Sequence, residues 1–317
     1  MGKLRHEGTH ARERKMNAVT PSKRLSARST TDESVYGPAM STHPRLRNSL
    51  SSLRQGNATP ADMQARKLKV LFVSEDDPIY VIKFFDVFLS EFPRDELEIC
   101  GITIDRPFHE SMWKTLGRVH GLYDLSGLIR QSLRFINARL RHRSIESLAV
   151  SMGITIIRPR SINRPEYIAR VRAIAPDVIV SVAAPEIFKT ELLGVPRLGC
   201  INIHSGRLPS YRGMMPTFWQ MQRGERAVTI TVHCMAEKLD AGDVLATQVF
   251  PIMPRDSLDR VIKGTKCEGA RLVIRVLRDL RTGRARPAPL DMNGAHYFSF
   301  PKRTDVREFC KIGHRLL

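Results

Sequence analysis

A chain of 317 residues, of which 42% are hydrophobic, is long enough to bury the core of one large domain or two small ones. It holds no apolar run of about eighteen residues, which excludes a membrane-spanning helix, and its N-terminus lacks the apolar stretch of a secretory signal. Its five cysteines are scattered without metal-ligand spacing, which argues against a disulfide framework or a zinc site and fits a reducing, cytoplasmic compartment.

The formal net charge of +19 is spread unevenly along the chain. Residues 1–67 hold 13 Lys and Arg against 5 Asp and Glu, a net charge of +8, and contain no Phe, Trp or Ile. Such a segment cannot bury enough apolar surface to offset the entropy of ordering it, so we predict a disordered basic extension. A solvated tail is the simplest interpretation, and a nucleic-acid-binding tail is the alternative.

From residue 68 onward, predicted strands alternate with predicted helices. Short apolar runs rich in β-branched residues indicate buried strands, and apolar residues at helical spacing indicate helices. The predicted strands are 68–74, 97–104, 154–157, 177–182 and 198–204. The predicted helices between them are 78–92, 164–175 and 186–194. This alternation indicates an α/β fold with a Rossmann-like, mostly parallel sheet and flanking helices.

A long insertion, residues 105–152, separates the second predicted strand from the third. Within it, residues 122–140 carry Leu and Ile at helical spacing, flanked by arginines. We interpret this segment as a helix packed through its apolar stripe, with a solvated basic face; contact with a phosphate, a partner or a membrane is the alternative. The stripe consists of Leu122, Leu125, Ile129, Leu133, Ile136 and Leu140, and the arginines are Arg130, Arg134, Arg139, Arg141 and Arg143.

The stretch INIHSGRLPSYRGMMP, residues 201–216, holds the first candidate site residues. Asn202 and His204 end the predicted strand two residues apart, so their side chains point to the same side of it. Ligands of a parallel α/β sheet bind beyond the carboxyl ends of its strands, where this pair would lie. A lone His there could be a structural hydrogen bonder, but Asn is depleted in strands, so the pair favours a site.

A third candidate side chain comes from a turn between two later strands. Residues 227–235 and 246–252 read as strands, and the turn between them carries Asp240 and Gly242. Taken alone, Asp240 is a residue of the kind commonly found in the turn of a hairpin and does not indicate a site.

The C-terminal part is predicted to be helical. Residues 256–283 form a long helix that packs back on the sheet, and Thr304 caps a last helix. In that last helix we expect Val306, Phe309 and Cys310 to face the core.

Taken together, these residues resemble the 10-formyltetrahydrofolate-dependent formyltransferases, a group with methionyl-tRNA, glycinamide ribonucleotide and sugar N-formyltransferases. That family carries a strand ending in Asn-x-His, a loop Leu-Pro-x-Tyr-Arg-Gly and a later Leu/Val-Asp-x-Gly, which stand here at 202–204, 208–213 and 239–242. The similarity covers about residues 68–255, and the three motifs in this order are more specific than any one of them. The organisation it implies is a disordered extension 1–67, a catalytic domain 68–283 and a C-terminal connector and helix 284–317 packed on the core.

The resemblance implies acyl transfer from 10-formyltetrahydrofolate, without a metal. It assigns Asn202 to donate a hydrogen bond to the tetrahedral oxyanion, His204 to move protons, and Asp240 to orient the His or hold a water. The implied folate-binding residues are Ala183, Ala184, Pro185, Ile187, Phe188, Glu237, Leu239 and Gly242. The implied acceptor-binding residues are Ser205, Gly206, Arg207, Tyr211 and Arg212. From the residues alone, Ile187 and Phe188 could equally be core positions.

Departures from the family pattern bear on the acceptor. Ser205-Gly206-Arg207 replaces the common Pro-Ser-Leu, and the first strand runs into SEDDPIY without a Gly-rich phosphate turn, which disfavours glycinamide ribonucleotide. The 77 residues after Asp240 leave no room for the separate β-barrel domain that grips tRNA, so we expect a small-molecule amine, such as an amino sugar. A methionyl-tRNA formyltransferase and a non-catalytic folate-binding module are the alternatives. The sequence is also compatible with a homodimer.

Overall fold

The computed structural model describes residues 66–105, 122–123, 125–141 and 143–317. The predicted disordered extension lies outside the described residues except for its last two, and so does part of the predicted insertion, residues 106–121. Arg66 Nη2 lies 2.7 Å from Asp177 Oδ1, and the Arg66 carbonyl accepts a hydrogen bond from Arg281. The chain therefore already contacts the folded domain at residue 66.

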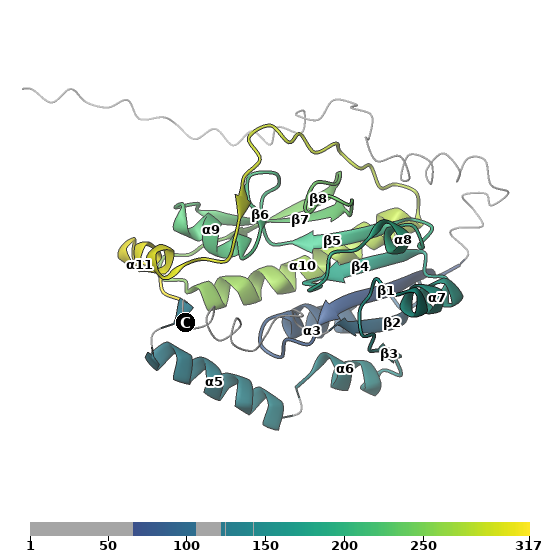
Figure 1. The fold of residues 1–317 in the computed structure, drawn as a ribbon, viewed down its shortest axis with the longest axis horizontal. Coiled ribbons are helices and arrows are strands. Elements are labelled where there is room, and N and C mark those ends of the chain that lie inside the picture. Colours follow the sequence, from purple (N-terminus) through teal and green to yellow (C-terminus); the bar gives the residue numbers. More distant parts are fainter. Residues whose placement is uncertain (1–65, 106–121, 124, 142) are drawn as a thin grey trace, which may run out of the picture. The chain divides into compact units, whose positions relative to one another are not determined.

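Seven strands form one mostly parallel sheet in the order β3-β2-β1-β4-β5-β7-β8 (Figure 1). The first five of these strands are parallel to one another, and β7 runs antiparallel to both β5 and β8. This sheet confirms the predicted α/β, Rossmann-like fold. The strands are β1 Leu68–Glu75, β2 Leu97–Asp105, β3 Ile156–Ile157, β4 Val178–Val182, β5 Cys200–His204, β7 Ala227–Cys234 and β8 Val244–Pro251.

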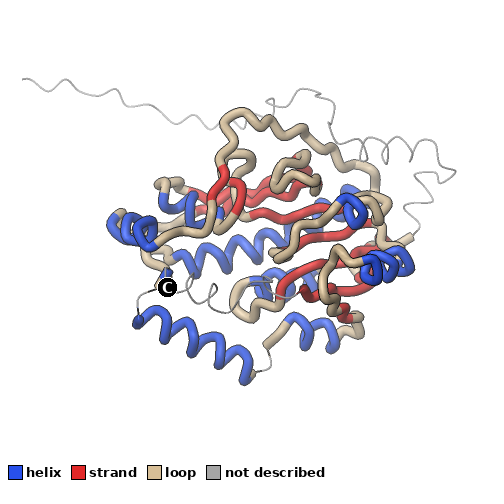
Figure 2. The backbone as a smooth tube through the Cα atoms, viewed as in Figure 1, coloured by secondary structure: helices blue, strands red, loops and turns tan. Residues whose placement is uncertain are grey.

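Helices flank the sheet, as Figure 2 shows. They are α3 Val81–Glu91, α5 Leu125–Leu140, α6 Ile145–Ser151, α7 Pro165–Ile174, α8 Thr190–Leu193, α9 Pro216–Gln222, α10 Leu258–Arg281 and α11 Arg303–Lys311. A second, two-stranded sheet pairs β6 Arg212–Gly213 with β9 Tyr297–Phe298, which ties the C-terminal segment to the loop after β5.

Successive residues of β1 point to opposite faces of the sheet and enter two separate cores. Phe72 lies in the core beneath α3 and α10, where its ring meets Phe88 edge-on at 4.8 Å. Leu71 and Val73 lie in the core that α7 and α8 cover on the other face. Because both faces are covered, the strands are continuous apolar runs rather than alternating ones.

Helix α8 has four residues, although the sequence predicts a helix over 186–194. The side chain of Asn163 explains the difference. It donates to the Ile187 carbonyl at 2.9 Å and accepts from the Lys189 N–H at 2.9 Å, so backbone groups that a helix would use are already bonded.

Two predictions for the last helix are wrong. Lys302 precedes α11 in extended conformation, and its N–H donates to Asp305 Oδ2 at 2.7 Å, so Thr304 lies inside the helix rather than at its cap. Val306 and Phe309 are buried as predicted, but Cys310 is exposed. One residue beyond Phe309 is a turn of about 100° around the helix, which carries Cys310 away from the core.

The packing predicted for the apolar stripe of the insertion is also wrong. None of the 16 residues of α5 is buried; only Leu122, which precedes the helix, enters a core cluster. None of the helices that the structure describes is long and apolar enough to cross a bilayer.

Candidate active site

Asn202 and His204 stand together at the carboxyl edge of the sheet, as the two-residue period of a strand requires. The antiparallel register of β5 and β7 sets Asn202 opposite His233 and His204 opposite Thr231. Asp240 follows β7 in the next loop, and its carboxylate reaches the same place. The structure therefore brings the three predicted catalytic side chains together.

His204 is buried, and its tautomer follows from one contact. Its Nε2 lies 2.6 Å from the carbonyl oxygen of Tyr211. Since a carbonyl can only accept, Nε2 carries the hydrogen. Nδ1 is then the nitrogen that faces Asp240 Oδ2, at 3.8 Å. Any proton that His204 gains or gives up during a reaction passes through Nδ1.

The carboxylate of Asp240 is buried between two imidazole rings. Oδ2 accepts a hydrogen bond from the Gly213 N–H at 2.9 Å, and Oδ1 lies 3.7 Å from His233 Nε2. Its distances to both rings are too long for direct hydrogen bonds. Arg212 holds this loop by donating from Nε to the Leu239 carbonyl at 3.1 Å. Asp240 thus lies close to both imidazole rings without a direct hydrogen bond to either.

His233 is a site residue that the sequence analysis missed. Its Nδ1 lies 2.8 Å from the Cys234 carbonyl and must donate to it, so Nε2 of the neutral ring is an acceptor. Asn202 Nδ2 lies 3.2 Å from that Nε2. Burial lowers the pKa of His233 to about 4, although Asp240 opposes the shift, so the ring stays neutral near pH 7. His233 therefore fixes which way the Asn202 amide faces and leaves its second N–H for a ligand.

The two predicted folate-binding loops adjoin each other. The Thr190 hydroxyl donates to Glu237, which connects the segment after residues 183–188 to the loop 236–242. Each loop exposes an apolar side chain: Ile187 is 60% exposed and Leu239 is 39% exposed. These two side chains offer apolar surface for a flat heterocycle.

Two of the predicted folate-binding residues, Phe188 and Gly242, have a structural role in the fold. Phe188 is only 1% exposed and lies in the core beneath α7 and α8, so no ligand can contact its ring. A Cβ on Gly242 would lie 1.9 Å from the Cys234 carbonyl oxygen, so only glycine lets the backbone pass there. Ala183, with φ of +55°, begins the first loop, and Ala184 and Pro185 continue it.

The residues predicted to bind the acceptor are largely engaged within the protein. Tyr211 is buried, its hydroxyl donates to Glu225 Oε1 at 2.8 Å, and Arg207 Nη2 donates to the same oxygen at 2.5 Å. The Ser205 carbonyl accepts from Gln220 at 3.0 Å. These contacts, with that of Arg212, hold the loop around His204, while the side chain of Arg207 stays 51% exposed.

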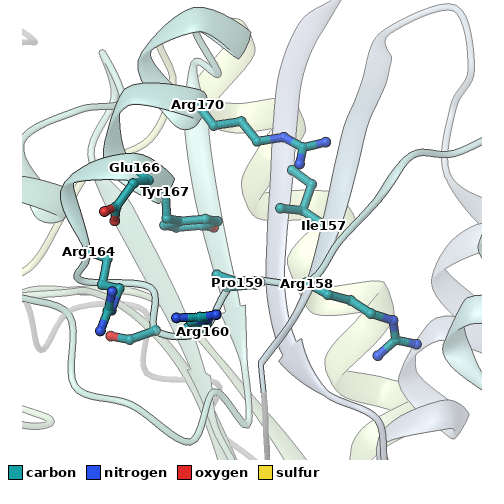
Figure 3. A pocket seen from close by; sticks show the side chains of 9 residues that line it. Ile157, Arg158, Pro159, Arg160, Arg164, Glu166, Tyr167 and Arg170 are labelled. Atoms are coloured by element: carbon teal, nitrogen blue, oxygen red, sulfur yellow. The ribbon is translucent and has the colours of Figure 1, made fainter.

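A cavity of about 350 Å³ lies next to the first folate-binding loop (Figure 3). Its wall is joined to that loop because the Ser161 hydroxyl donates to Glu186 at 2.7 Å. Of its lining arginines, Arg158 pairs with Glu146. The lining residues are Ile157, Arg158, Pro159, Arg160, Ser161, Arg164, Glu166, Tyr167 and Arg170. Four arginines against one glutamate make the cavity suited to an anionic group.

An amide donor, a histidine of fixed tautomer and a buried carboxylate at the carboxyl edge of a parallel sheet define a site suited to acyl transfer with proton transfer. Comparison with known proteins agrees. Residues 131–277 match the family model described as formyl transferase. Over these residues, somewhat under half of the chain, the sequence is similar to the formyl transferase family. In the described part of the chain, no group of three His, Cys, Asp or Glu side chains is placed to hold a metal ion.

Curated relatives are similar over part of their length. The methionyl-tRNA formyltransferase of Geobacillus thermodenitrificans is 37% identical over 155 residues, 49% of this chain and 49% of the relative. That of Macrococcus caseolyticus is 30% identical over 200 residues, 62% of this chain and 64% of the relative. The chain spans about half the length of the first relatives it matches. Among solved structures, a sugar N-formyltransferase from Shewanella sp superimposes with a TM-score of 0.47 and 20% identity, covering 73% of this chain and 76% of that one.

Proposed function

We propose that this protein transfers the formyl group of 10-formyltetrahydrofolate to the amino group of an acceptor. The observation that carries the proposal is the grouping of Asn202, His204 and Asp240 at the carboxyl edge of β5 in a formyl transferase domain. The same three positions match the family's motifs in the sequence.

In the proposed reaction the acceptor amine attacks the formyl carbon, and a new C–N bond and an oxyanion form. The free N–H of the Asn202 amide donates to that oxyanion, and such a donor is typically worth ~3 kcal/mol of barrier. His204 takes the amine's proton at Nδ1, beside Asp240, which stabilises the imidazolium. The intermediate collapses when the bond between the formyl carbon and the folate nitrogen breaks, and that nitrogen receives the proton that His204 took up at Nδ1, which returns His204 to its neutral form.

The folate is proposed to bind between the loops 183–188 and 236–242. The exposed side chains of Ile187 and Leu239 support this placement, because they give apolar surface on two loops that the hydrogen bond from Thr190 to Glu237 joins. Ala183, Ala184 and Pro185, which begin the first of these loops, are proposed to contact the heterocycle.

The proposed acceptor is a small-molecule amine, with an amino sugar as the leading candidate. Its support is that Ser205-Gly206-Arg207, directly after His204, replaces the Pro-Ser-Leu that is common in the family. The second candidate is methionyl-tRNA, which the names of the curated relatives favour.

Both acceptors are tested in one experiment. The full chain is incubated with 10-formyltetrahydrofolate and either a set of nucleotide-linked amino sugars or methionyl-tRNA, and products are analysed by mass spectrometry for the gain of one CO. We expect a formylated product with the wild-type chain and none with His204→Ala. Folate binding without formylation of any acceptor would refute catalysis and favour a folate-binding module.

A further inference from the structure

Helix α5 presents its apolar side to solvent. Six of its large hydrophobic side chains are between 43% and 75% exposed. They are Leu125, Ile129, Leu133, Phe135, Ile136 and Leu140. Figure 1 shows α5 at the lower edge of the view, farther from the sheet than α3. A contiguous apolar surface of this kind on a folded domain marks a surface that contacts something else.

The opposite side of α5 holds it to the domain. Arg134 Nη2 lies 2.5 Å from Asp259 Oδ1 at the start of α10, and Asp259 also pairs with Lys263. A shallow cavity beside Ile79 is lined by Leu128, Gln131, Ser132, Phe135 and Ile136, so the last two side chains face the domain in part. Four residues of the stripe, Leu125, Ile129, Leu133 and Leu140, are between 52% and 75% exposed, so this part of the apolar surface faces outward.

The positive charge of α5 and the residues directly after it indicates which kind of partner would bind. Residues 125–143 contain five arginines and no Asp or Glu. Arg134 and Arg143 pair with carboxylates of the domain. Within the described residues, Arg130 and Arg141 have no carboxylate partner. An apolar stripe flanked by free guanidinium groups complements a surface of anionic headgroups over acyl chains.

We propose that α5 is an interfacial membrane-binding helix, which lays its apolar stripe into the surface of an anionic bilayer while its free arginines contact lipid phosphates. A second copy of the chain fits this face less well, because pairing two such helices would bring their arginines together. The role is separate from formyl transfer and does not depend on the acceptor.

The test is co-sedimentation of the full chain with vesicles of mixed phosphatidylglycerol and phosphatidylcholine. The stripe variant is Leu133→Gln with Leu140→Gln, which keeps helix propensity and removes no buried contact. The matched control is Val150→Gln with Met253→Gln, comparably exposed apolar residues outside α5. We expect wild type and control to sediment, and the stripe variant to bind at least ~10-fold more weakly.

Electrostatics are tested by Arg130→Gln with Arg141→Gln. This variant should lose most of its binding to anionic vesicles, and added salt should weaken wild-type binding in the same way. The proposal is overturned if the wild-type chain stays in the supernatant. It is also overturned if the stripe variant sediments like wild type, which would assign binding to the basic residues 1–67. A wild-type dimer that the stripe variant converts to a monomer would assign the face to a second copy instead.

Discussion

The substitution Gly206→Ala tests how tightly the residues around His204 are packed. The added Cβ would lie 2.6 Å from His204 Nε2 and 2.7 Å from the Tyr211 carbonyl oxygen, whereas ordinary contact begins at 3.4 Å. The neighbours must therefore move by about 0.8 Å, the difference between 3.4 and 2.6. His204 and that carbonyl are hydrogen-bonded to each other, so neither can move without disturbing the other.

For Gly206→Ala we expect a loss of about 1–3 kcal/mol in the free energy of unfolding, the usual cost of overpacking. Because a shift of about 1 Å in a catalytic group costs up to ~10²-fold in rate, kcat should fall on that scale while folate affinity changes little. Thermal unfolding measures the first effect. Initial rates of formyl transfer to the acceptor found in the product screen measure the second.

Gly199→Ala is the control for stability alone. Gly199 has φ of +81°, and a Cβ added to it would have no atom within 4 Å, so the substitution strains the backbone without touching His204. It should lower stability by about 1 kcal/mol and leave kcat unchanged. A Gly206→Ala protein with wild-type unfolding and wild-type rate would show that the contacts around His204 are looser than this reasoning requires.

The remaining predictions concern the proposed catalytic and folate-binding groups. His204→Ala and Asp240→Asn should each lower kcat by at least ~10²-fold with folate binding retained, and near-normal turnover in either would remove its catalytic assignment. Asn202→Asp should lose more activity than Asn202→Ala, because it sets an anion against the oxyanion, and the reverse order would make Asn202 a structural residue. The lowered pKa of His233 makes its neutral form part of the folded state, so its contribution to stability is complete above about pH 6.5 and is lost as pH falls through about 4. Denaturant unfolding at several pH values should therefore show wild type losing stability relative to His233→Gln in that window, and parallel profiles would contradict the assignment. Ile187→Ser should weaken folate binding in titration calorimetry without lowering the melting temperature, since the side chain is exposed; unchanged affinity would move the folate elsewhere.

The sequence by itself determined the order of strands and helices and the position of the site along the chain. Apolar runs without alternation belong to strands covered on both faces, so their places could be read directly, as β1 and β4 show. The pair Asn202 and His204 had to share one side of β5 because side chains two residues apart always do. The strand positions and the shared side of Asn202 and His204 depend on local periodicity, which can be read from a few consecutive residues.

Only the tertiary structure decided which side chains meet across elements. The role of His233 depends on the antiparallel register of β7 against β5, which places it opposite Asn202 from 31 residues away in the chain. The sequence could not show that the Tyr211 hydroxyl donates to Glu225. The apolar stripe of α5 predicted burial, but an ion pair between Arg134 and Asp259 holds the helix by its other side. Register and ion pairing are contacts between distant segments, and amphipathicity fixes only that a helix has an apolar side, not what that side faces.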